Sequence, residues 1–331
     1  MKHPTISIVT PSFNQGQYIT QTLDSVLIQG YPACEHIVMD GGSQDATPEI
    51  LSAYGEQLHY WESVPDQGQS HAINKGFARS TGSILTWLNS DDQLLPGTLD
   101  AVAEAFRQNP ELDLLYGDCV LFTESGKERV SRPEQPAEAL LGGMIFAQPA
   151  SFFSRRMYER FGPLSQDLHF AMDYDFFLPI AQEGQTTYLD RPLARYLYHT
   201  ESKSVTHNAG FAREYAQVLG KLLLSSGEAG ARWYARLCRD GVLRPVTETA
   251  RYAFTSSPTE AQLRQAILYN LVSQAKYYYA ATDLRAAYRL LSWIKAEDVH
   301  FFRQYPQLPS TYWRSRWVPA PLMRRWRRER F

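Results

Sequence analysis

The chain has 331 residues, of which 44% are hydrophobic and 21% are charged, and its formal net charge is −2. This length is sufficient for one large α/β domain with a smaller second part, and it allows a sizeable buried core. The sequence contains no run of 18 apolar residues and no signal peptide before its first strand-like run, so we expect a cytoplasmic protein without a membrane-spanning helix.

Strand-like and helix-like segments alternate over the first 118 residues. The predicted strands are 6–10, 35–40, 58–62, 84–88 and 112–116, and the predicted helices are 18–29, 47–54, 69–78 and 96–108. This alternation predicts a mostly parallel sheet with helices on both faces. A polar, proline-containing stretch at 124–138 then precedes a region with further helices and at least one more strand.

Beyond residue 208 the apolar residues follow helical spacing, as in Tyr215, Val218, Leu219 and Leu222. We therefore expect three parts along the chain. The first is an α/β domain at 1–207 whose two halves meet near residue 118. A helical appendix follows at 208–311, and a basic, aromatic tail follows at 312–331.

The tail at 312–331 differs in charge from the rest of the chain. It holds seven arginines and one glutamate, which gives it a charge of +6, so the remaining chain carries −8. Arginines interleaved with Trp313, Trp317 and Trp326 suit the anionic surface of a membrane, on the inner face of the cell membrane if the protein is cytoplasmic. The alternative is a solvated tail, or one that pairs with the acidic body or a second subunit. Nucleic acid is not expected as a partner because the acidic body would repel it.

The apolar run at 85–88 ends abruptly at Asn89, Ser90, Asp91 and Asp92. Such a run is typical of a buried strand, and open α/β sheets bind ligands at the carboxyl ends of their strands. Two adjacent carboxylates repel each other and favour a partner that neutralises both, most simply a divalent cation carrying phosphates. The alternative is an Asp-rich cap for the helix that follows.

Polar residues also follow other strands of the predicted sheet. The first segment holds Asn14 with Pro11 and the aromatic Phe13, after the first strand. The second holds Asp40 with two glycines, after the second strand, and the third holds Asp66, Asn74 and Lys75, before and within the third helix. An aromatic side chain offers a face to a base or ribose, and glycines let a ligand approach the backbone. Each segment alone is compatible with ordinary turn chemistry. Together with 89–92, these three segments place four groups of polar residues at one edge of the sheet, which indicates a ligand site.

Five motifs occur in a fixed order between residues 4 and 207. They are Pro11-Ser12-Phe13-Asn14, Asp40-Gly41-Gly42-Ser43 with Asp45, Asp66-Gln67-Gly68 with Asn74-Lys75-Gly76, Asn89-Ser90-Asp91-Asp92, and Met172-Asp173-Tyr174-Asp175. In this order they resemble glycosyltransferase family 2, and in particular bacterial transferases of surface-polysaccharide assembly. The resemblance implies the GT-A fold, a Rossmann-like, mostly parallel sheet flanked by helices, and inverting transfer from a nucleotide-diphosphate sugar.

The resemblance also implies roles for the residues at the sheet edge. It assigns the nucleotide to Pro11, Phe13, Asn14, Asp40 and Asp66, with Asn74 and Lys75 near the ribose and diphosphate. Asn89-Ser90-Asp91 occupies the family's Asp-x-Asp position, so Asn89 and Ser90 are expected at the substrate and Asp91 at Mn²⁺ or Mg²⁺. Because Asn89 replaces the usual first aspartate and brings no charge to the metal, we expect either a lower metal affinity or metal binding that relies also on Asp92. UDP is the nucleotide that the family favours.

Inverting transfer requires a base that takes the proton of the attacking acceptor hydroxyl. Asp173 matches the family's base, although Met172 stands where many members have glutamate. Asp175 is expected to orient the loop or contact the acceptor; the alternative is that one aspartate caps a helix and the other is solvated. His199 resembles a histidine that reaches the metal and diphosphate from a closing loop, and its alternative is a histidine packed among aromatic residues.

The acceptor is expected to be a saccharide or a lipid-linked saccharide, with Asp118 and Gln148 as candidate contacts. The strand that enters this half is expected to end at Asp118. A sugar nucleotidyltransferase would share the sheet and the metal, but no glycine-rich phosphate loop follows the first strand. A non-catalytic nucleotide-sugar-binding scaffold in a polysaccharide assembly complex is compatible with Asn89 and Met172. A processive synthase is disfavoured because the sequence has no membrane spans.

Overall fold

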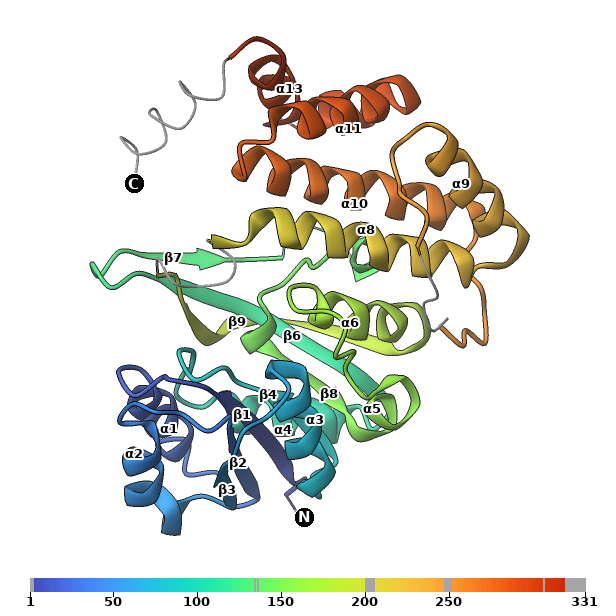
Figure 1. The fold of residues 1–331 in the computed structure, drawn as a ribbon. Coiled ribbons are helices and arrows are strands. Elements are labelled where there is room, and N and C mark those ends of the chain that lie inside the picture. The colour runs from blue at the N-terminus through green and yellow to red at the C-terminus, as the bar shows by residue number, and fades with distance from the viewer. Residues whose placement is uncertain are drawn as a thin grey trace. The chain divides into compact units, whose positions relative to one another are not determined.

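The computed structural model describes residues 3–133, 135, 137–199, 206–246, 252–305 and 307–318. The chain divides into two compact units (Figure 1). Unit 1 comprises Met1–Ala137 and Met144–His199, and unit 2 comprises Glu138–Gly143 and Thr200–Phe331. Unit 2 therefore includes a short segment that the sequence-based boundaries leave in the first domain.

Unit 1 is built on a sheet of nine strands in the described residues. The strands are β1 (Ile6–Ser12), β2 (Cys34–Asp40), β3 (Tyr60–Ser63), β4 (Ile84–Trp87), β5 (Gln93–Leu94), β6 (Leu112–Phe122), β7 (Glu128–Ser131), β8 (Ser151–Ser154) and β9 (Gln185–Leu197). The helices are α1 (Ile19–Leu27), α2 (Thr47–Tyr54), α3 (Gln69–Arg79), α4 (Thr98–Gln108), α5 (Arg155–Phe161) and α6 (Met172–Glu183). The four helices predicted before residue 118 are all present, with ends within two residues of those expected.

The strand order is β3-β2-β1-β4-β8-β6-β9-β5, and β7 pairs with β6. Strands β1, β2, β3 and β4 are mutually parallel, and β6 runs parallel to β9. Strand β8 lies antiparallel between β4 and β6, so β6 and β9 run in the same direction as β1. Only β5, β7 and β8 of the described strands run the other way, which confirms the predicted mostly parallel sheet.

Strand β6 does not end at Asp118, as the sequence predicted, but continues to Phe122. Its register against β9 shifts at Asp118, between the pairs formed by Gly117 and Cys119. A local irregularity of this kind bends a strand without ending it. Glycine and aspartate disfavour strands by propensity, but the buried Cys119 and pairing with β9 outweigh that preference here.

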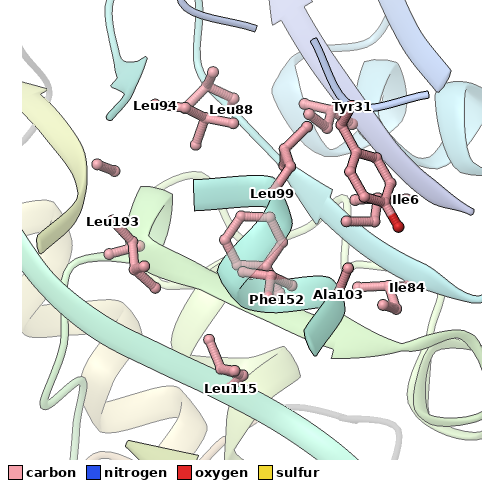
Figure 2. Packing of buried hydrophobic residues seen from close by; sticks show 14 of the residues in the cluster. Ile6, Tyr31, Ile84, Leu88, Leu94, Leu99, Ala103, Leu115, Phe152 and Leu193 are labelled. Atoms are coloured by element: carbon pink, nitrogen blue, oxygen red, sulfur yellow. The ribbon is translucent and has the colours of Figure 1, made fainter. Parts of the chain in front are cut away.

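Helices pack on both faces of the sheet. On one face, Leu99 and Ala103 of α4 pack among Ile6, Ile84 and Phe152 of the strands (Figure 2). On the other face, α3 lies so close to β1 that a Cβ added to Gly76 would be 2.4 Å from Val9 Cγ1. That second face also carries an aromatic cluster, in which the rings of Trp87 and Phe177 stack with centroids 5.5 Å apart. Burial of each large apolar side chain of this kind contributes about 1.5–3 kcal/mol of hydrophobic free energy to folding.

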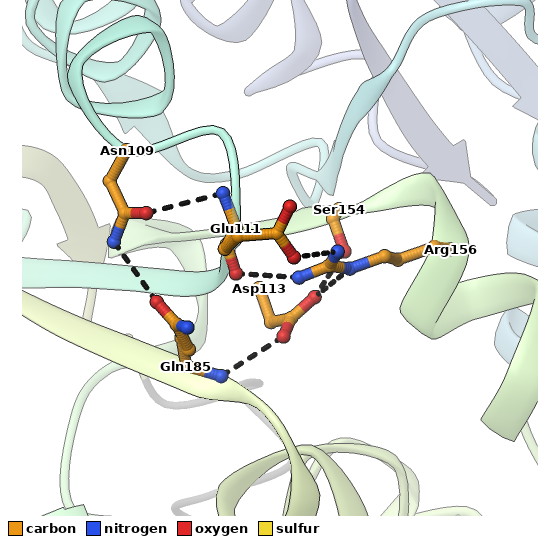
Figure 3. A network of polar contacts seen from close by, with 6 residues as sticks. All are labelled: Asn109, Glu111, Asp113, Ser154, Arg156 and Gln185. Atoms are coloured by element: carbon orange, nitrogen blue, oxygen red, sulfur yellow. Dashed lines mark hydrogen bonds and ion pairs between the residues drawn. The ribbon is translucent and has the colours of Figure 1, made fainter.

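A polar network joins four elements where β6 begins (Figure 3). The Arg156 guanidinium donates to Asp113 Oδ1 at 2.6 Å and to Glu111 Oε2 at 2.7 Å. Buried Asp113 also accepts from Ser154 Oγ and from the Gln185 backbone N–H, both at 2.9 Å. Hydrogen bonds to Asp113 and then Glu111 raise the pKa of Arg156. Charge-assisted hydrogen bonds offset the cost of burying this carboxylate.

Unit 2 is helical in the residues described. Its helices are α8 (Asn208–Leu224), α9 (Gly227–Arg239), α10 (Glu260–Ala280), α11 (Leu284–Glu297), α12 (Val299–Gln304) and α13 (Gln307–Trp317). The segment Glu138–Gly143 lies tightly on α10, since a Cβ added to Gly142 would be 2.5 Å from Tyr269 Cβ. Within the described ranges, no helix combines the length and apolar character that crossing a membrane requires.

Candidate functional site at the carboxyl ends of the strands

Strands β1, β2 and β4 end at the same edge of the sheet. Ser12 pairs with Asp40 across β1 and β2, and the Leu88 N–H after β4 donates to Val9 O at 2.9 Å. The Gly41 N–H donates to Ser12 O at 2.8 Å and extends the pairing into the loop. The polar segments predicted to follow β1, β2 and β4 are therefore neighbours, although they are separated by dozens of residues in sequence.

Asp40 organises the loop that follows β2. Its carboxylate accepts from the Ser43 N–H at 2.9 Å, from Ser43 Oγ at 2.5 Å and from Ser63 Oγ at 2.6 Å. Gly42 has φ +81, a left-handed conformation that glycine adopts without strain. The Asn14 N–H donates to Ser43 Oγ at 2.7 Å and ties the β1 loop to this one. Asp40 thus shapes the loop, and its contact with a nucleotide stays a prediction.

Phe13, Gly41 and Asp66 come together beside that loop. A Cβ added to Gly41 would lie 3.0 Å from Asp66 Oδ2 and 3.3 Å from Phe13 Cδ2, so any larger residue at 41 would fill the space between them. The Phe13 side chain is 59% exposed. Asp66 Oδ1 accepts from the Gly68 N–H at 2.7 Å. An exposed ring beside a carboxylate can stack a base and accept a hydrogen bond from a ribose hydroxyl or base N–H.

Asn74 and Lys75 of α3 are engaged by other parts of the protein. The Asn74 side chain donates to Leu164 O at 2.8 Å and accepts from the Leu164 N–H at 2.9 Å. It thereby fixes the loop that leads to α6. Lys75 forms an ion pair with Glu62. The predicted contacts of both residues with ribose and diphosphate stay predictions, and each would compete with these internal contacts.

Asp91 and His199 meet after β4 and β9. Asp91 Oδ2 lies 3.1 Å from His199 Nε2, and the Asp91 side chain is 24% accessible. The Tyr18 ring packs against the His199 ring with centroids 5.0 Å apart, and Tyr18 OH donates to Glu124 Oε1 at 2.8 Å. The sequence paired Asp91 with His199 but gave no role to Tyr18, which was placed only as the start of a helix.

Asp92 lies fully buried beneath Asp91. Its Oδ1 accepts from the Leu197 N–H at 3.3 Å and its Oδ2 from Asn89 Nδ2 at 3.1 Å. Burial first, and then the charge of Asp91, raise the pKa of Asp92 well above its usual range. No cluster of three His, Cys, Asp or Glu residues suited to a metal occurs in the described ranges. Asp92 therefore holds the turn against β9, and its role as a metal ligand stays a prediction.

Asn89 links the same turn to α3. Its Oδ1 accepts from Gln69 Nε2 at 2.8 Å, while its Nδ2 donates to Asp92. Ser90, a predicted substrate contact, is buried in the turn. Sequence reasoning did not assign Gln69 to the site; its signal is its place at the first position of α3, directly after Asp66-Gln67-Gly68.

The Asp91 and His199 pair fits a divalent cation of the Mn²⁺ or Mg²⁺ type. Such cations prefer oxygen ligands, and imidazole is also suited to transition metals. Mg²⁺ in phosphate-transfer sites is commonly held by one or two protein ligands, with the rest supplied by phosphates and water. A carboxylate oxygen and an imidazole nitrogen 3.1 Å apart supply two converging donors of this kind.

Asp173 lies in the first turn of α6, and the start of this helix contacts the start of α3. Ser70 Oγ donates to Met172 Sδ at 2.8 Å, and Ser70 directly follows the Gln69 that contacts Asn89. Asp173 Oδ1 accepts from the Tyr174 N–H at 2.7 Å and its side chain is partly exposed, whereas Asp175 is buried. The positive end of a helix favours an ionised carboxylate in its first turn. The start of α6, which bears Asp173, therefore lies near the Asn89 turn.

Asp118 and Gln148, the predicted acceptor contacts, are both buried. Asp118 Oδ1 accepts from Tyr188 OH at 2.6 Å, and its Oδ2 lies 3.2 Å from Arg132 Nε. Gln148 Nε2 donates to Trp87 O at 2.8 Å, and its Oε1 has no hydrogen-bond partner among the described residues. Gln148 thus lies at the end of β4 with a spare acceptor atom. Its contact with an acceptor, like that of Asp118, stays a prediction.

Comparisons with known proteins agree with this architecture. Residues 7–163 match the sequence model of glycosyl transferase family 2. An uncharacterised glycosyltransferase of Mycobacterium tuberculosis is 33% identical over 182 residues, which cover 54% of this chain and 69% of that one.

Two solved structures share the fold. S. aureus TarS 1-349 in complex with UDP has a TM-score of 0.56 at 16% identity, covering 95% of this chain and 93% of that one, and the match spans 54% of a longer TarS structure. The mannosyltransferase PcManGT from Pyrobaculum calidifontis, in complex with GDP-Man and Mn²⁺, has a TM-score of 0.57 at 18% identity, covering 96% and 88%. The structural matches show the GT-A fold. The sequence matches show that the chain belongs to glycosyl transferase family 2.

Proposed function

We propose that this chain transfers a sugar, with inversion, from a nucleotide-diphosphate sugar to a saccharide or lipid-linked saccharide. The observation that carries the proposal is the Asp91 and His199 pair, which lies at the same sheet edge as the exposed Phe13 ring and the Asp173 carboxylate. The nucleotides bound by structural neighbours, UDP in TarS and GDP-Man in PcManGT, support a nucleotide sugar as donor. We favour UDP.

The donor nucleotide would lie along the loops after β1 and β2. The Phe13 ring would stack on the base, and Asp66 would accept hydrogen bonds from the base or ribose. Gly41 leaves room for this, because a side chain at that position would meet both residues. Loop geometry is set in advance by Asp40, which is held by three hydrogen bonds from Ser43 and Ser63. Such pre-organisation lowers the entropy that binding must overcome.

The transfer step would proceed by in-line displacement. The acceptor hydroxyl oxygen attacks the anomeric carbon as its proton passes to the Asp173 carboxylate, and the bond from that carbon to the diphosphate oxygen breaks with its electron pair leaving on the diphosphate. Asp91 and His199 would hold Mn²⁺ or Mg²⁺, which neutralises the charge of the leaving diphosphate. Asn89 and Asp92 would keep the turn that bears Asp91 in place through their contacts with Gln69 and Leu197.

The first test is binding of a panel of nucleoside diphosphates and nucleotide sugars, measured by thermal shift with Mn²⁺ and with EDTA. We expect a Mn²⁺-dependent rise in melting temperature for one nucleotide, which the Asp91→Ala variant loses. Asp100→Ala removes an exposed carboxylate from α4 and serves as the matched control, with binding unchanged. No shift for any nucleotide would contradict the donor site.

Turnover distinguishes an enzyme from a nucleotide-binding scaffold. Slow hydrolysis of the sugar nucleotide that binds best should release the nucleoside diphosphate and a sugar of inverted anomeric configuration, observable by proton NMR before mutarotation. Binding without any such release, in the presence of Mn²⁺ and a range of saccharide acceptors, would favour the scaffold.

A further inference from the structure

Helix α13 in unit 2 has one buried side and one side with exposed tryptophans. Leu308, Tyr312 and Ser315 are buried, whereas Trp313 is 53% exposed and Trp317 is 66% exposed. Because the two tryptophans are four residues apart, they lie on the same side of the helix. Large, exposed indoles placed together are uncommon on a surface that has no partner.

The buried side fixes α13 on its neighbours. Tyr312 packs against the Tyr288 ring of α11, with centroids 5.0 Å apart, and against the Phe302 ring of α12 at 5.7 Å. The hydroxyl groups of Tyr312 and Tyr288 lie 3.3 Å apart. The helix is thus anchored through Tyr312, and rotation that would bury Trp313 and Trp317 would remove these contacts.

Cationic side chains lie over aromatic rings of α13 and of the neighbouring α11. The Arg316 guanidinium lies 4.9 Å from the Trp317 ring centroid and 5.8 Å from that of Tyr288, and Lys295 Nζ lies 4.8 Å from the Tyr312 ring. Arg314, Arg316 and Lys295 are all exposed. The nearest acidic residues in sequence to Lys295, Glu297 and Asp298, form ion pairs with other arginines of unit 2. The positive charge beside the tryptophans is therefore not cancelled by these two carboxylates.

The sequence beyond the described residues continues this composition. Trp326 and five arginines follow, at 324, 325, 327, 328 and 330, with one glutamate at 329. Helix α13 is thus the described start of a cationic, tryptophan-containing segment. Its charge complements an anionic surface and would repel a second copy of itself.

We propose that the α13 face, defined as Trp313, Arg314, Arg316, Trp317 and Lys295, docks on the anionic headgroup surface of a lipid bilayer. Indole rings favour the boundary between headgroups and acyl chains, where their apolar body is buried and their N–H remains hydrated. A guanidinium group can donate two parallel hydrogen bonds to the oxygens of one phosphate. Each basic side chain near an anionic leaflet adds to the electrostatic attraction between protein and membrane. The face combines both kinds of group on one anchored helix.

The test is sedimentation of the full chain with vesicles of phosphatidylcholine alone and of phosphatidylcholine mixed with phosphatidylglycerol. We expect binding to the mixed vesicles that weakens as salt is raised, and little binding to phosphatidylcholine. The Trp313→Ala/Trp317→Ala variant should bind at least about ten-fold more weakly, because it loses most of the apolar area that the face can bury. Arg314→Gln and Arg316→Gln should each reduce affinity about five-fold.

Matched controls separate this face from general effects. Ile28→Ala removes an exposed apolar side chain and Arg129→Gln an exposed cation, both in unit 1, and neither should change vesicle binding. Trp313→Phe/Trp317→Phe should retain most of the affinity. Circular dichroism and nucleotide binding of each variant report folding and the donor site independently, so this test does not depend on the proposed transfer reaction.

Three results would overturn the proposal. Equal binding of wild type to neutral and anionic vesicles would remove the electrostatic argument. Unchanged binding of the double tryptophan variant would assign the contact to another part of the chain. Absence of vesicle binding, together with a concentration-dependent dimer in sedimentation velocity that the same variant loses, would make a second copy the partner of this face.

Discussion

Two clusters of carboxylates at opposite ends of the same sheet are neutralised in different ways. Where β6 begins, Asp113 and Glu111 share the Arg156 guanidinium, and Ser154 and Gln185 supply further donors to Asp113 (Figure 3). The protein itself thus provides the positive charge and the hydrogen bonds that a buried carboxylate needs.

Where β4 ends, Asp91 and Asp92 have a different set of partners. The partners described for the Asp92 carboxylate are the neutral Asn89 amide and the Leu197 N–H. The partner described for Asp91 is the His199 ring, whose Nε2 lies 3.1 Å from Asp91 Oδ2. Burial and the neighbouring charge of Asp91 raise the pKa of Asp92, a sign that the negative charge is poorly compensated. The comparison teaches that an arginine of the fold neutralises the carboxylates where β6 begins. No lysine or arginine partner is described for Asp91 or Asp92, which is why we propose a bound cation at that edge.

We call the sheet edge where β1, β2 and β4 end the ligand end, because the candidate site lies there. The largest expected effect of a substitution at this end is at Asp173, in the first turn of α6. Asp173→Asn removes the carboxylate that we propose as the base but keeps the size of the side chain, so we expect transfer to fall about 10²- to 10⁴-fold. Nucleotide-sugar affinity, measured by thermal shift, should remain within about two-fold, since a base acts mainly in the transition state.

A control for Asp173 is available on the preceding loop. Asp167→Asn removes an exposed carboxylate six residues upstream and should leave the rate unchanged. A large loss of nucleotide binding in Asp173→Asn would instead show that Asp173 supports the donor site. A rate unaffected by the change would assign the base to another residue.

Much of the ligand end could be read from sequence because its groups follow directly after strands. The terminal residues of β1, β2 and β4 are fixed by the register of parallel strands, so Asp40, Asn89 and Asp91 could be assigned to one edge. The starts of helices α2 and α3 could also be predicted from the sequence, since a proline lies in the first turn of α2 and a glycine precedes α3.

The partners of those groups could not be read in the same way. The Leu197 N–H that holds Asp92 comes from a strand about 100 residues later, and backbone donors leave no mark in a sequence. Arg156 and Asp113 are ordinary charged residues until folding brings β6 and α5 together. The assignment of Glu138–Gly143 to unit 2 could not be predicted either, because the segment is continuous in sequence with the first domain.

A buried histidine, His36, is a different kind of polar group on the same sheet. His36 of β2 is buried with its Nε2 3.0 Å from Thr10 Oγ1, and burial lowers its pKa to about 4. Below the unfolded value of about 6.5, the unfolded chain binds the proton and the folded chain resists it. The free energy of unfolding should therefore be highest above pH 6.5, where His36 is neutral in both states. It should fall by about 3 kcal/mol as the pH decreases to about 4.

Urea unfolding at several pH values between 7 and 4 measures this loss. His36→Gln retains a hydrogen-bonding group for Thr10 but cannot titrate, so its stability should vary less over that range. His59→Gln, an exposed histidine that precedes β3, is the matched control and should follow wild type. An identical pH profile for His36→Gln and wild type would show that His36 does not set the acid limit.

Removing Arg156 from its network with Asp113 and Glu111 should lower the free energy of unfolding without affecting the candidate ligand site. Arg156→Ala leaves the buried Asp113 with its hydrogen bonds from Ser154 and Gln185 but without a cation. Removing one partner of a buried charged group costs about 1–3 kcal/mol, as measured by urea unfolding. Nucleotide affinity of the folded variant should be unchanged.

Arg107→Ala provides the control for this change. Arg107 forms an exposed ion pair with Glu104 within α4, and such pairs contribute about 0–1 kcal/mol. Equal losses in the two variants would mean that the Asp113 network contributes no more than a surface pair. A loss of nucleotide binding in Arg156→Ala would show that the two ends of the sheet are coupled.

The smallest expected effect concerns Tyr18, which links the ligand end to the β6–β7 turn through its hydrogen bond to Glu124. Tyr18→Phe keeps the ring that packs on His199 and loses only that bond, which contributes about 1 kcal/mol, so KM for the nucleotide sugar should rise by no more than about five-fold. Tyr18→Ala also removes the ring and should raise KM further, while kcat at saturating Mn²⁺ falls because His199 is less well held. Tyr54→Phe, which breaks a similar exposed hydrogen bond to Asp24, should leave both constants unchanged. If Tyr18→Ala behaved like Tyr54→Phe, the Tyr18 ring would not be what positions His199, and other contacts of the histidine, such as the one with Asp91, would hold it in place.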